Sequence, residues 1–484
     1  MVSPMLFIIA PLGAAFLMTS INRREIALVL SLLTAAGLGL LGFSWLPATL
    51  ELAQPVVAAA IRGPMGIALS LDALGTALAI IVALSTTLVL LYSSSYLPKG
   101  HHEVRYYAVV MLLMASSFGL VLARDVFNLF VFFEILCISS YILVSWEQTG
   151  AALEASFKYM VLGSIGSIFI LVSIALSYHV AGSLAMADIA QAFRTAPKAY
   201  GIMAAVLFLF GFGVEAAIFP VNTWLPDAHS SAPSSISALL SGFVIELALL
   251  VVFRVQNTVF ATVDMLPVLQ VLGISGVIVG EFAAFGQKDL KRMLAYSSIS
   301  QVGIMLFAIS LGTTAGAQAG VYHVIMHAGA KSALFLIAGY FILRTGRRLV
   351  EDYRGLGQRM PVSAALFGLA ALSLLGAPPL FGFFTKFMIL SAAASAGGGL
   401  AWFGIAAILL GTVLEALYLF RVIRTLFAPG DTVATGGRVV RAEMDLPALV
   451  AVAVFTALVV FGALLLPALS SMIGPIANGL VTLH

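Results

Sequence analysis

Ionisable side chains occur inside long apolar runs of this sequence, where a charge is costly and is usually retained for function. Six of them lie well inside such runs: Glu134, Glu215, Glu246, Lys331, Lys386 and Glu415. His323 and His327 precede Lys331 at intervals of four residues. In a helix this spacing puts all three on one face, over about 12 Å. A row of titratable groups at membrane depth is typical of a path for protons or cations.

Other roles stay open for some of these residues. A membrane glutamate can join two helices by a hydrogen bond or reach a helix end, which applies to Glu281 and Glu415. His323 could be a core histidine with satisfied hydrogen bonds. Packing alone explains poorly why four costly groups recur in separate runs, namely Glu134, Glu215, Glu246 and Lys386.

The elements that must position these groups are membrane helices. The chain has 484 residues, of which 61% are hydrophobic and 9% charged, whereas soluble domains carry roughly 25% charged residues. Runs of about 20 apolar residues can cross a bilayer, and β-barrel strands would alternate instead. The sequence therefore predicts an all-α integral membrane protein with fourteen helices, near 4–20, 26–46, 72–94, 106–123, 126–146, 158–178, 200–218, 235–256, 266–287, 292–313, 319–343, 363–390, 401–424 and 446–470.

Basic residues in the loops predict the orientation. If loops alternate between two sides, seventeen of the 24 Lys and Arg residues fall on one side and five on the other, with Lys331 and Lys386 inside the membrane. The basic side is expected to be cytoplasmic, in a prokaryotic cytoplasmic membrane, with both termini on the other side. No basic segment precedes residues 4–20, so a signal peptide is not expected.

Several function classes are excluded by what the sequence contains. A single cysteine, Cys137, cannot form an iron–sulfur cluster or a cysteine-rich zinc site within this chain. No glycine-rich phosphate loop precedes a helix, and the basic residues are explained by topology rather than by nucleic-acid binding. We therefore expect no cofactor, no metal and no catalytic redox site in this chain.

Two apolar helices are broken by prolines. The stretches "AIFPVNTWLP" and "LLGAPPLFGFFTK" interrupt the predicted seventh and twelfth helices. Broken helices in corresponding halves indicate inverted repeats around an ion path, although ordinary proline kinks are an alternative. Glu215 and Glu246 are 31 residues apart, and Lys386 and Glu415 are 29 apart. The predicted parts are helices 1–3 (1–105), a first repeat of helices 4–8 (106–256), a second of helices 9–13 (266–427) and helix 14 (446–470).

Five stretches carry a family resemblance: "RDVFNLFVFFEILCISSYILV", "FPVNTWLPDAHSSAPSSISALLSG", "DLKRMLAYSSISQVGIM", "VYHVIMHAGAKSALFLIAG" and "GAPPLFGFFTKFMIL". Over roughly residues 70 to 425 the chain resembles the antiporter-like family shared by the membrane arm of respiratory complex I, Mrp Na⁺/H⁺ antiporters (their D-type component) and membrane-bound hydrogenases. The resemblance implies fourteen helices with two inverted five-helix repeats. It also implies an ion-translocating polar axis along the membrane midplane.

The resemblance assigns roles to most of the buried ionisable residues. Glu134 matches the helix 5 glutamate of a charged pair, and Lys386 matches the helix 12 lysine. The residues His323, His327 and Lys331 match a central relay. Two positions depart from the pattern, because Glu215 and Glu246 stand where relatives usually carry lysine.

A cluster of Glu134, Glu215 and Glu246 is therefore expected instead of a charged pair. Burial and like charge disfavour full ionisation, so at least one member should carry a proton at neutral pH. Such a cluster could relay protons, bind Na⁺ through its oxygens, or mark a first half that has become a spacer.

These observations predict a proton-translocating, Na⁺/H⁺-antiporting or purely proton-relaying membrane subunit of a larger complex of the complex I, hydrogenase or Mrp type. Its expected partners are homologous antiporter-like subunits, a redox or antiporter module, the lipid bilayer, and H⁺ or Na⁺. A scaffold subunit without transport and a stand-alone secondary transporter are the alternatives. Asp227 and His229, in "LPDAHSSAP", are either channel-mouth groups or turn-forming polar residues.

Overall fold

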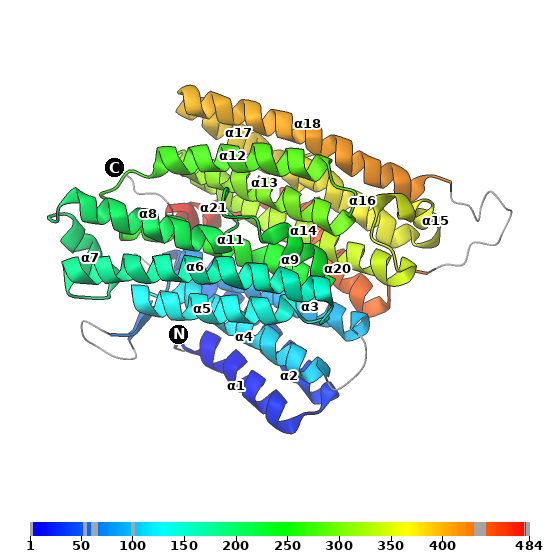
Figure 1. Cartoon of the computed structure of the whole chain (residues 1–484), viewed down its shortest axis with the longest axis horizontal. Helices are drawn as coiled ribbons and strands as arrows, with labels where there is room; N and C mark the ends of the chain where they lie inside the picture. Colours follow the sequence, from blue (N-terminus) through cyan, green and yellow to red (C-terminus); the bar gives the residue numbers. More distant parts are fainter. Residues whose placement is uncertain are drawn as a thin grey trace.

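The chain folds into a bundle of long helices that run side by side (Figure 1). A computed structural model describes residues 3–51, 56–59, 66–97, 102–429, 442–478 and 480. Four basic residues of the loop-charge count lie outside this part of the chain: Arg62, Lys99, Arg438 and Arg441. Within the described residues, twelve helices are long and apolar enough to cross a membrane, and three shorter apolar helices accompany them.

Each of the fourteen predicted apolar runs corresponds to helix in the structure. The unbroken helices are α1 (Leu6–Ile21), α2 (Arg24–Glu51), α3 (Ala73–Tyr96), α4 (His102–Leu122), α5 (Val126–Val144), α6 (Gly150–Ala181), α12 (Leu266–Phe285), α13 (Leu290–Ser310), α14 (Thr314–Thr345) and α18 (Gly399–Phe427). The broken ones are α8 (Lys198–Glu215) with α9 (Leu225–Ser231), and α16 (Pro361–Leu375) with α17 (Phe381–Ala396). The eighth predicted helix comprises α10 (Ser234–Leu239), the π-turn η1 (Leu240–Val244) and α11 (Ile245–Thr258), and the fourteenth comprises α20 (Leu446–Phe461), η3 (Gly462–Leu465) and α21 (Leu466–Asn478).

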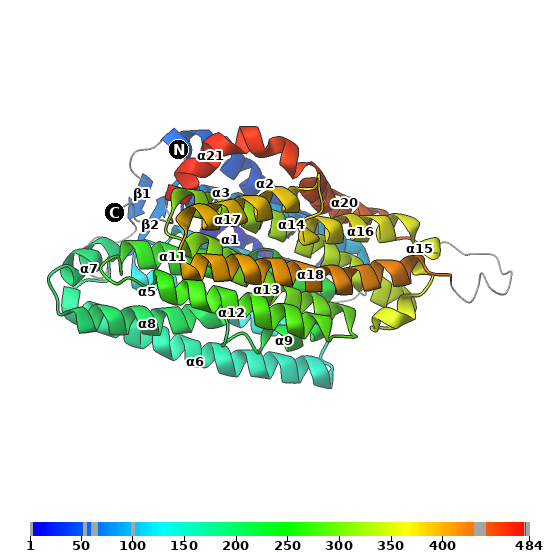
Figure 2. The same ribbon diagram turned by 90° about the horizontal axis from the view of Figure 1, so that it is seen from above.

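Short elements that hydropathy did not predict connect these helices. Strands β1 (Val56–Ala59) and β2 (Ala68–Leu71) form an antiparallel pair at the end of the bundle where α1 begins and α21 ends (Figure 2). The other short elements are α7 (Met186–Phe193), η2 (Val350–Tyr353) and α15 (Leu356–Arg359). We call the end of the bundle that holds α15 the basic end, because the loop arginines Arg344, Arg347 and Arg348 lie there.

The same backbone pairing recurs in the two halves of the chain. Asp125, which caps the start of α5, forms a β-bridge with Ala185, and Asp289, which caps the start of α13, forms one with Leu349. Each aspartate accepts a hydrogen bond from the third N–H of its helix, as N-cap residues do. The Asp289 bridge lies at the basic end beside Arg348, and the Asp125 bridge lies near β2 at the opposite end. Matched connections at opposite ends support inverted repeats.

Both predicted helix breaks are present, and at each break a side chain donates to a backbone carbonyl at the end of the helix. The α8 break is served by Trp224, whose Nε1 lies 2.7 Å from the Val214 carbonyl oxygen. The α16 break is served by Lys386, whose Nζ lies 3.1 Å from the Leu375 carbonyl oxygen. Broken backbone is thus kept satisfied inside the protein, as membrane depth requires.

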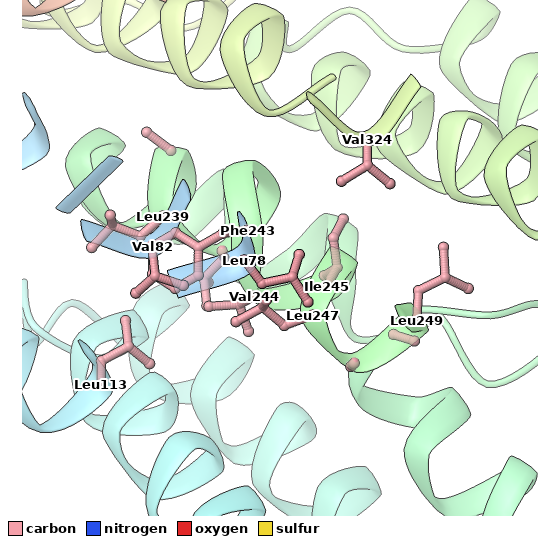
Figure 3. Packing of buried hydrophobic residues seen from close by; sticks show 14 of the residues in the cluster. Leu78, Val82, Leu113, Leu239, Phe243, Val244, Ile245, Leu247, Leu249 and Val324 are labelled. Atoms are coloured by element: carbon pink, nitrogen blue, oxygen red, sulfur yellow. The ribbon is translucent and has the colours of Figure 1, made fainter. Parts of the chain in front are cut away.

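The helices around the breaks form the buried centre of the molecule. In the most apolar stretch of each helix, the share of buried residues is 100% for 234–258, 94% for α13 and 89% for α14. The corresponding share is only 39% for α6 and for α18. Side chains of the η1–α11 segment, including Phe243 and Leu247, pack with Leu78 and Val82 of α3 and with Leu113 of α4 (Figure 3). The helix that carries Glu246 is therefore enclosed by protein on all sides.

Candidate functional site

A buried ion pair inside the bundle joins α17 to α18. Lys386 Nζ lies 2.6 Å from Glu415 Oε2, and the two side chains are only 7% and 1% exposed. The break before α17 positions the lysine, because the same ammonium group also donates to the Leu375 carbonyl. A buried pair of this kind is stable only while both partners keep their charges or exchange a proton. Glu415 therefore belongs to the ionisable set and does not serve packing alone.

Gln301 of α13 connects this pair to His323. Its amide nitrogen lies 3.0 Å from Glu415 Oε1, and its carbonyl oxygen lies 2.8 Å from His323 Nε2. Because the amide donates to the carboxylate, its oxygen must accept, so the Nε2 of His323 carries the hydrogen. The Nδ1 of His323 lies 3.0 Å from the Thr385 hydroxyl. Gln301 cannot itself take up a proton at neutral pH, so its role is to fix the tautomer of His323.

The predicted row on α14 continues one turn further to a carboxylate. His327 Nδ1 is hydrogen-bonded to Glu246 Oε1 of α11, and both side chains are buried. The remaining atoms His327 Nε2 and Glu246 Oε2 are buried and have no partner among the described protein atoms. Lys331, one turn beyond, donates to the Leu294 carbonyl at 2.9 Å and to the Ser297 hydroxyl of α13. The three residues thus lie on one face, as their spacing predicted.

His229 of α9 lies in the interior and not at a channel mouth. Its side chain is fully buried, and its ring stacks on Phe335 of α14 with centroids 4.8 Å apart. Neither ring nitrogen has a hydrogen-bond partner among the described residues. It lies near enough to His327 and Lys331 to interact with them electrostatically. The broken seventh helix therefore contributes a titratable ring to the centre of the relay.

Asp227, two residues earlier, does lie at the edge of the bundle. Its carboxylate lies 3.0 Å from Lys158 Nζ of α6 and 2.6 Å from Arg292 of α13. These two contacts attach α9 to α6 of the first half of the chain and to α13 of the second half. A surface groove of about 400 Å³ is lined by Lys158, Asp227 and Trp224.

A second cluster surrounds Glu215, the last residue of α8. The hydroxyl of Tyr159 donates to Glu215 Oε1 at 2.6 Å, and the thiol of Cys137 lies 3.3 Å from Oε2. Trp224 stacks on Tyr159 with ring centroids 3.6 Å apart and an angle of 1°. Two neutral donors therefore hold this fully buried carboxyl. Among the residues that the structure describes, no cationic side chain forms an ion pair with Glu215.

Glu134 shares this cluster, but Glu246 does not. Glu134 lies three residues before Cys137 on the same face of α5, accepts a hydrogen bond from Ser167, and interacts electrostatically with Glu215. Glu246 instead pairs with His327. The expected three-carboxylate cluster is therefore divided, because the π-turn and α11 direct Glu246 toward α14. Within the described ranges, no group of three His, Cys, Asp or Glu side chains is arranged to hold a metal ion.

Glu281 of α12 extends the pair formed by Lys386 and Glu415. Its side chain is 1% exposed and lies near Glu415, Ser300 and Tyr418. A Cβ atom on Gly411 of α18 would lie 3.1 Å from its Cγ. Glycine at position 411 thus makes room for a second carboxyl beside the first. Glu281 is a member of the buried ionisable set rather than a residue at a helix end.

Several polar residues of the site were not predicted from the sequence. They are the neutral partners Tyr159, Cys137, Ser167, Gln301, Thr385 and Ser297. Serine and threonine are common in membrane helices, so type and spacing did not distinguish Ser167, Ser297 and Thr385. Only the position of Cys137 three residues after Glu134 could have indicated a shared face.

Comparisons with known proteins identify relatives of this chain. Residues 123–414 match the family described as NADH:quinone oxidoreductase/Mrp antiporter, transmembrane. The chain is 32% identical over 438 residues to the N-type component of the NADH-quinone oxidoreductase of Desulforudis audaxviator, covering 88% of this chain and 87% of that one. It is 33% identical over 331 residues to the D-type component of the Na⁺/H⁺ antiporter of Bacillus subtilis, covering 68% of this chain and 67% of that one.

Solved structures give the same result for the fold. A chain of the membrane-bound sulfane sulfur reductase, an archaeal respiratory membrane complex, superposes with a TM-score of 0.90 at 30% identity, covering 99% of this chain and 97% of that chain. A chain of the Mrp complex from Dietzia sp. superposes with a TM-score of 0.87 at 24% identity, with the same coverage of 99% and 97%. The second likeness concerns the fold alone.

Proposed function

Because this chain belongs to the NADH:quinone oxidoreductase/Mrp antiporter transmembrane family, we propose that it translocates protons as one membrane subunit of a larger complex. The observation that carries the proposal is the linked set of buried titratable groups on α18, α17, α14 and α11. Hydrogen bonds connect Glu415 to Lys386, connect Glu415 through Gln301 to His323, and connect His327 to Glu246. Packing does not require such a set.

In the proposed path, a proton arriving at the Lys386–Glu415 pair changes the charge that the histidines of α14 experience. His327 and Glu246 exchange a proton across their hydrogen bond, and His229 lies near enough to His327 to influence it electrostatically. A charge change at one buried group alters the proton affinity of the next, because the protein interior screens charges weakly. Transport therefore proceeds by electrostatic steps between fixed groups.

The Glu134–Glu215 site is the proposed terminus of the path in the first half. Glu215 receives hydrogen bonds only from neutral donors in the described residues, so its charge has no cationic partner there. A proton supplies that compensation when the site is loaded. Trp224, which lines the groove beside Asp227, stacks on the Tyr159 ring, so this groove is the proposed access route to the site.

The proposed setting is a prokaryotic cytoplasmic membrane with the basic end in the cytoplasm. Relatives are named as subunits of a quinone oxidoreductase and of a Na⁺/H⁺ antiporter, so we propose further membrane subunits as partners. Those partners supply the driving reaction. The residues of this chain along the proposed path offer proton-carrying groups.

The proposal is tested by ion flux in inverted vesicles that contain the intact complex, with H⁺ and Na⁺ measured separately. The natural chain is compared with the variant Glu215→Lys with Glu246→Lys. In sodium-free medium, we expect the natural chain to show H⁺ flux. Sodium flux is measured separately in medium that contains Na⁺. Sodium flux in the natural form that the lysine variant loses would instead assign a cation site to these acids. Absence of both fluxes while the partner reaction runs would contradict transport and favour a scaffold.

Replacing Tyr159 by phenylalanine removes the hydroxyl that holds Glu215 and keeps the ring that stacks on Trp224. We expect H⁺ flux to fall about tenfold, since a hydrogen bond to a charged partner is of that magnitude. Assembly should be unchanged because the aromatic stack remains. Ser173→Ala is the matched control: it removes another contact between α6 and α8, from the Ser173 hydroxyl to the Ala204 carbonyl at 2.7 Å. Equal flux in both variants would exclude a role for the Tyr159 hydroxyl.

A further inference from the structure

A groove of about 1060 Å³ lies at the basic end of α18, away from the buried relay. Its polar lining contains three arginines, Arg354, Arg421 and Arg424, and it contains no Asp or Glu. None of the three forms an ion pair with a carboxylate in the part of the chain that the structure describes. The groove therefore concentrates positive charge that the described part of the chain leaves without an ion pair.

Backbone contacts hold the Arg421 side chain and place the segment that carries Arg354. Arg421 donates to the Gln287 carbonyl at 2.6 Å, which fixes one nitrogen of its guanidinium group. Arg354 follows η2, and the next residue, Gly355, donates its N–H to the Thr425 carbonyl of α18 at 3.3 Å. This contact brings Arg354 beside the last turns of α18. The set is therefore assembled from two separate elements.

The helix dipole does not explain the set. A cation in the last turn of a helix is favourable, which accounts for Arg424. Arg421 lies about one turn earlier, and Arg354 belongs to a different element. Loop topology favours arginines on this side in general, but it does not require three of them to converge on one groove.

Apart from the arginines and Thr425, the lining of the groove is apolar. Leu417 and Phe420 are 53% and 51% exposed and precede Arg421 and Arg424 on α18, whereas Phe427, which is 52% exposed, lies beyond them at the end of the helix. The exposed apolar face continues along α18 toward the middle of the bundle through Leu410 and Val413. An apolar strip thus runs from the arginines of the groove toward the middle of the bundle. A free phosphate would use the arginines but not this apolar strip.

We propose that this groove binds an anionic phospholipid, with its phosphate between Arg354, Arg421 and Arg424 and an acyl chain along Leu417 and Phe420. Arginine binds phosphate oxygens through paired N–H groups, and basic pockets at the cytoplasmic side of membrane proteins bind acidic headgroups. The site is independent of the ion path, because it faces outward from α18, whereas Glu415 faces inward.

The test uses the intact complex in vesicles of phosphatidylcholine with a trace of photoactivatable phosphatidylglycerol, and measures labelling of the peptide that contains residues 416–427. We expect strong labelling in the natural chain, displaced by unlabelled phosphatidylglycerol but not by added phosphatidylcholine. In Arg421→Gln with Arg424→Gln, labelling should fall about 25-fold, from roughly fivefold for each arginine near a membrane surface.

The matched control removes two other exposed arginines at the same end, with Arg23→Gln and Arg347→Gln, and should label like the natural chain. Equal labelling by a photoactivatable phosphatidylcholine, or equal loss in the control, would reduce the effect to general attraction and overturn the proposal. If the groove instead receives a protein subunit, the natural complex will show no labelling that phosphatidylglycerol displaces. That competition experiment needs no variant, so a variant that fails to assemble leaves the test intact.

Discussion

Replacing Lys386 by methionine should lower H⁺ flux by about two orders of magnitude or more, the usual contribution of a positioned proton-transfer group. Methionine keeps much of the length of the side chain and removes the ammonium group that lies 2.6 Å from Glu415. Glu415 would then be a buried carboxylate without a cation, and it would bind a proton permanently. The first exchange of the path would be lost. Flux is measured in inverted vesicles against the rate of the partner reaction.

Structural damage from the same change can be separated from loss of transport. Removing one partner of a buried ion pair costs roughly 3–5 kcal/mol, whereas removing both is often close to neutral. Lys386→Met with Glu415→Leu should therefore recover the thermal stability of the complex that Lys386→Met loses. We expect flux to remain lost in the double variant. Recovery of flux together with stability would show that the pair holds α17 to α18 and does not carry protons.

The fold was predictable because the bilayer imposes long apolar runs, and because proline leaves a clear signal where it breaks a helix. Every predicted run corresponds to helix, and both breaks lie where "AIFPVNTWLP" and "LLGAPPLFGFFTK" stand. The small amphipathic helix α7 and the β1–β2 pair were missed, since neither has the length of a membrane span. Hydropathy also could not locate the π-turn η1, which depends on how α11 packs.

The site was predictable at the level of residue type and only partly in its pairing. Ionisable groups such as Lys386 and Glu415 can be identified from the sequence because they lie inside apolar runs. Which groups meet depends on helix rotation, and the turn at η1 aims Glu246 at His327 rather than at Glu215. For His229 the sequence left a channel-mouth role and a turn-forming role open, because polar residues surround it in the sequence. Its ring is buried against Phe335, which lies about a hundred residues away along the chain.

The division of the carboxylates gives Glu215 and Glu246 different surroundings. Glu215 has Tyr159 and Cys137 as donors in a site it shares with Glu134. Glu246 has an imidazole as its partner, which suits proton exchange near neutral pH. The two acids therefore have different roles in the proposed path. Glu246 connects the first repeat, through α11, to the relay on α14 of the second.

Replacing Glu246 by glutamine should interrupt that connection and lower H⁺ flux by about two orders of magnitude. Glutamine has nearly the same shape and can still hydrogen-bond to His327 Nδ1, so the packing of α11 against α14 should persist. An amide cannot take the proton that a carboxylate takes, so exchange across this contact stops. Glu246→Asp keeps the acid but shortens the side chain, and we expect it to retain partial flux. If Glu246 had only a structural role, Glu246→Gln would reduce H⁺ flux less than Glu246→Asp, because glutamine preserves the shape of the side chain.

Ser332→Ala is the matched control for this contact. Ser332 lies one residue beyond Lys331 on α14, is buried, and donates to the Ala238 carbonyl at the end of α10 at 3.3 Å. Its removal weakens the same helix interface without touching a titratable group, so flux should stay near that of the natural chain. If Ser332→Ala and Glu246→Gln reduced flux equally, the interface would matter for its packing. If only Glu246→Gln did so, the hydrogen bond to His327 is the step by which the two repeats exchange a proton.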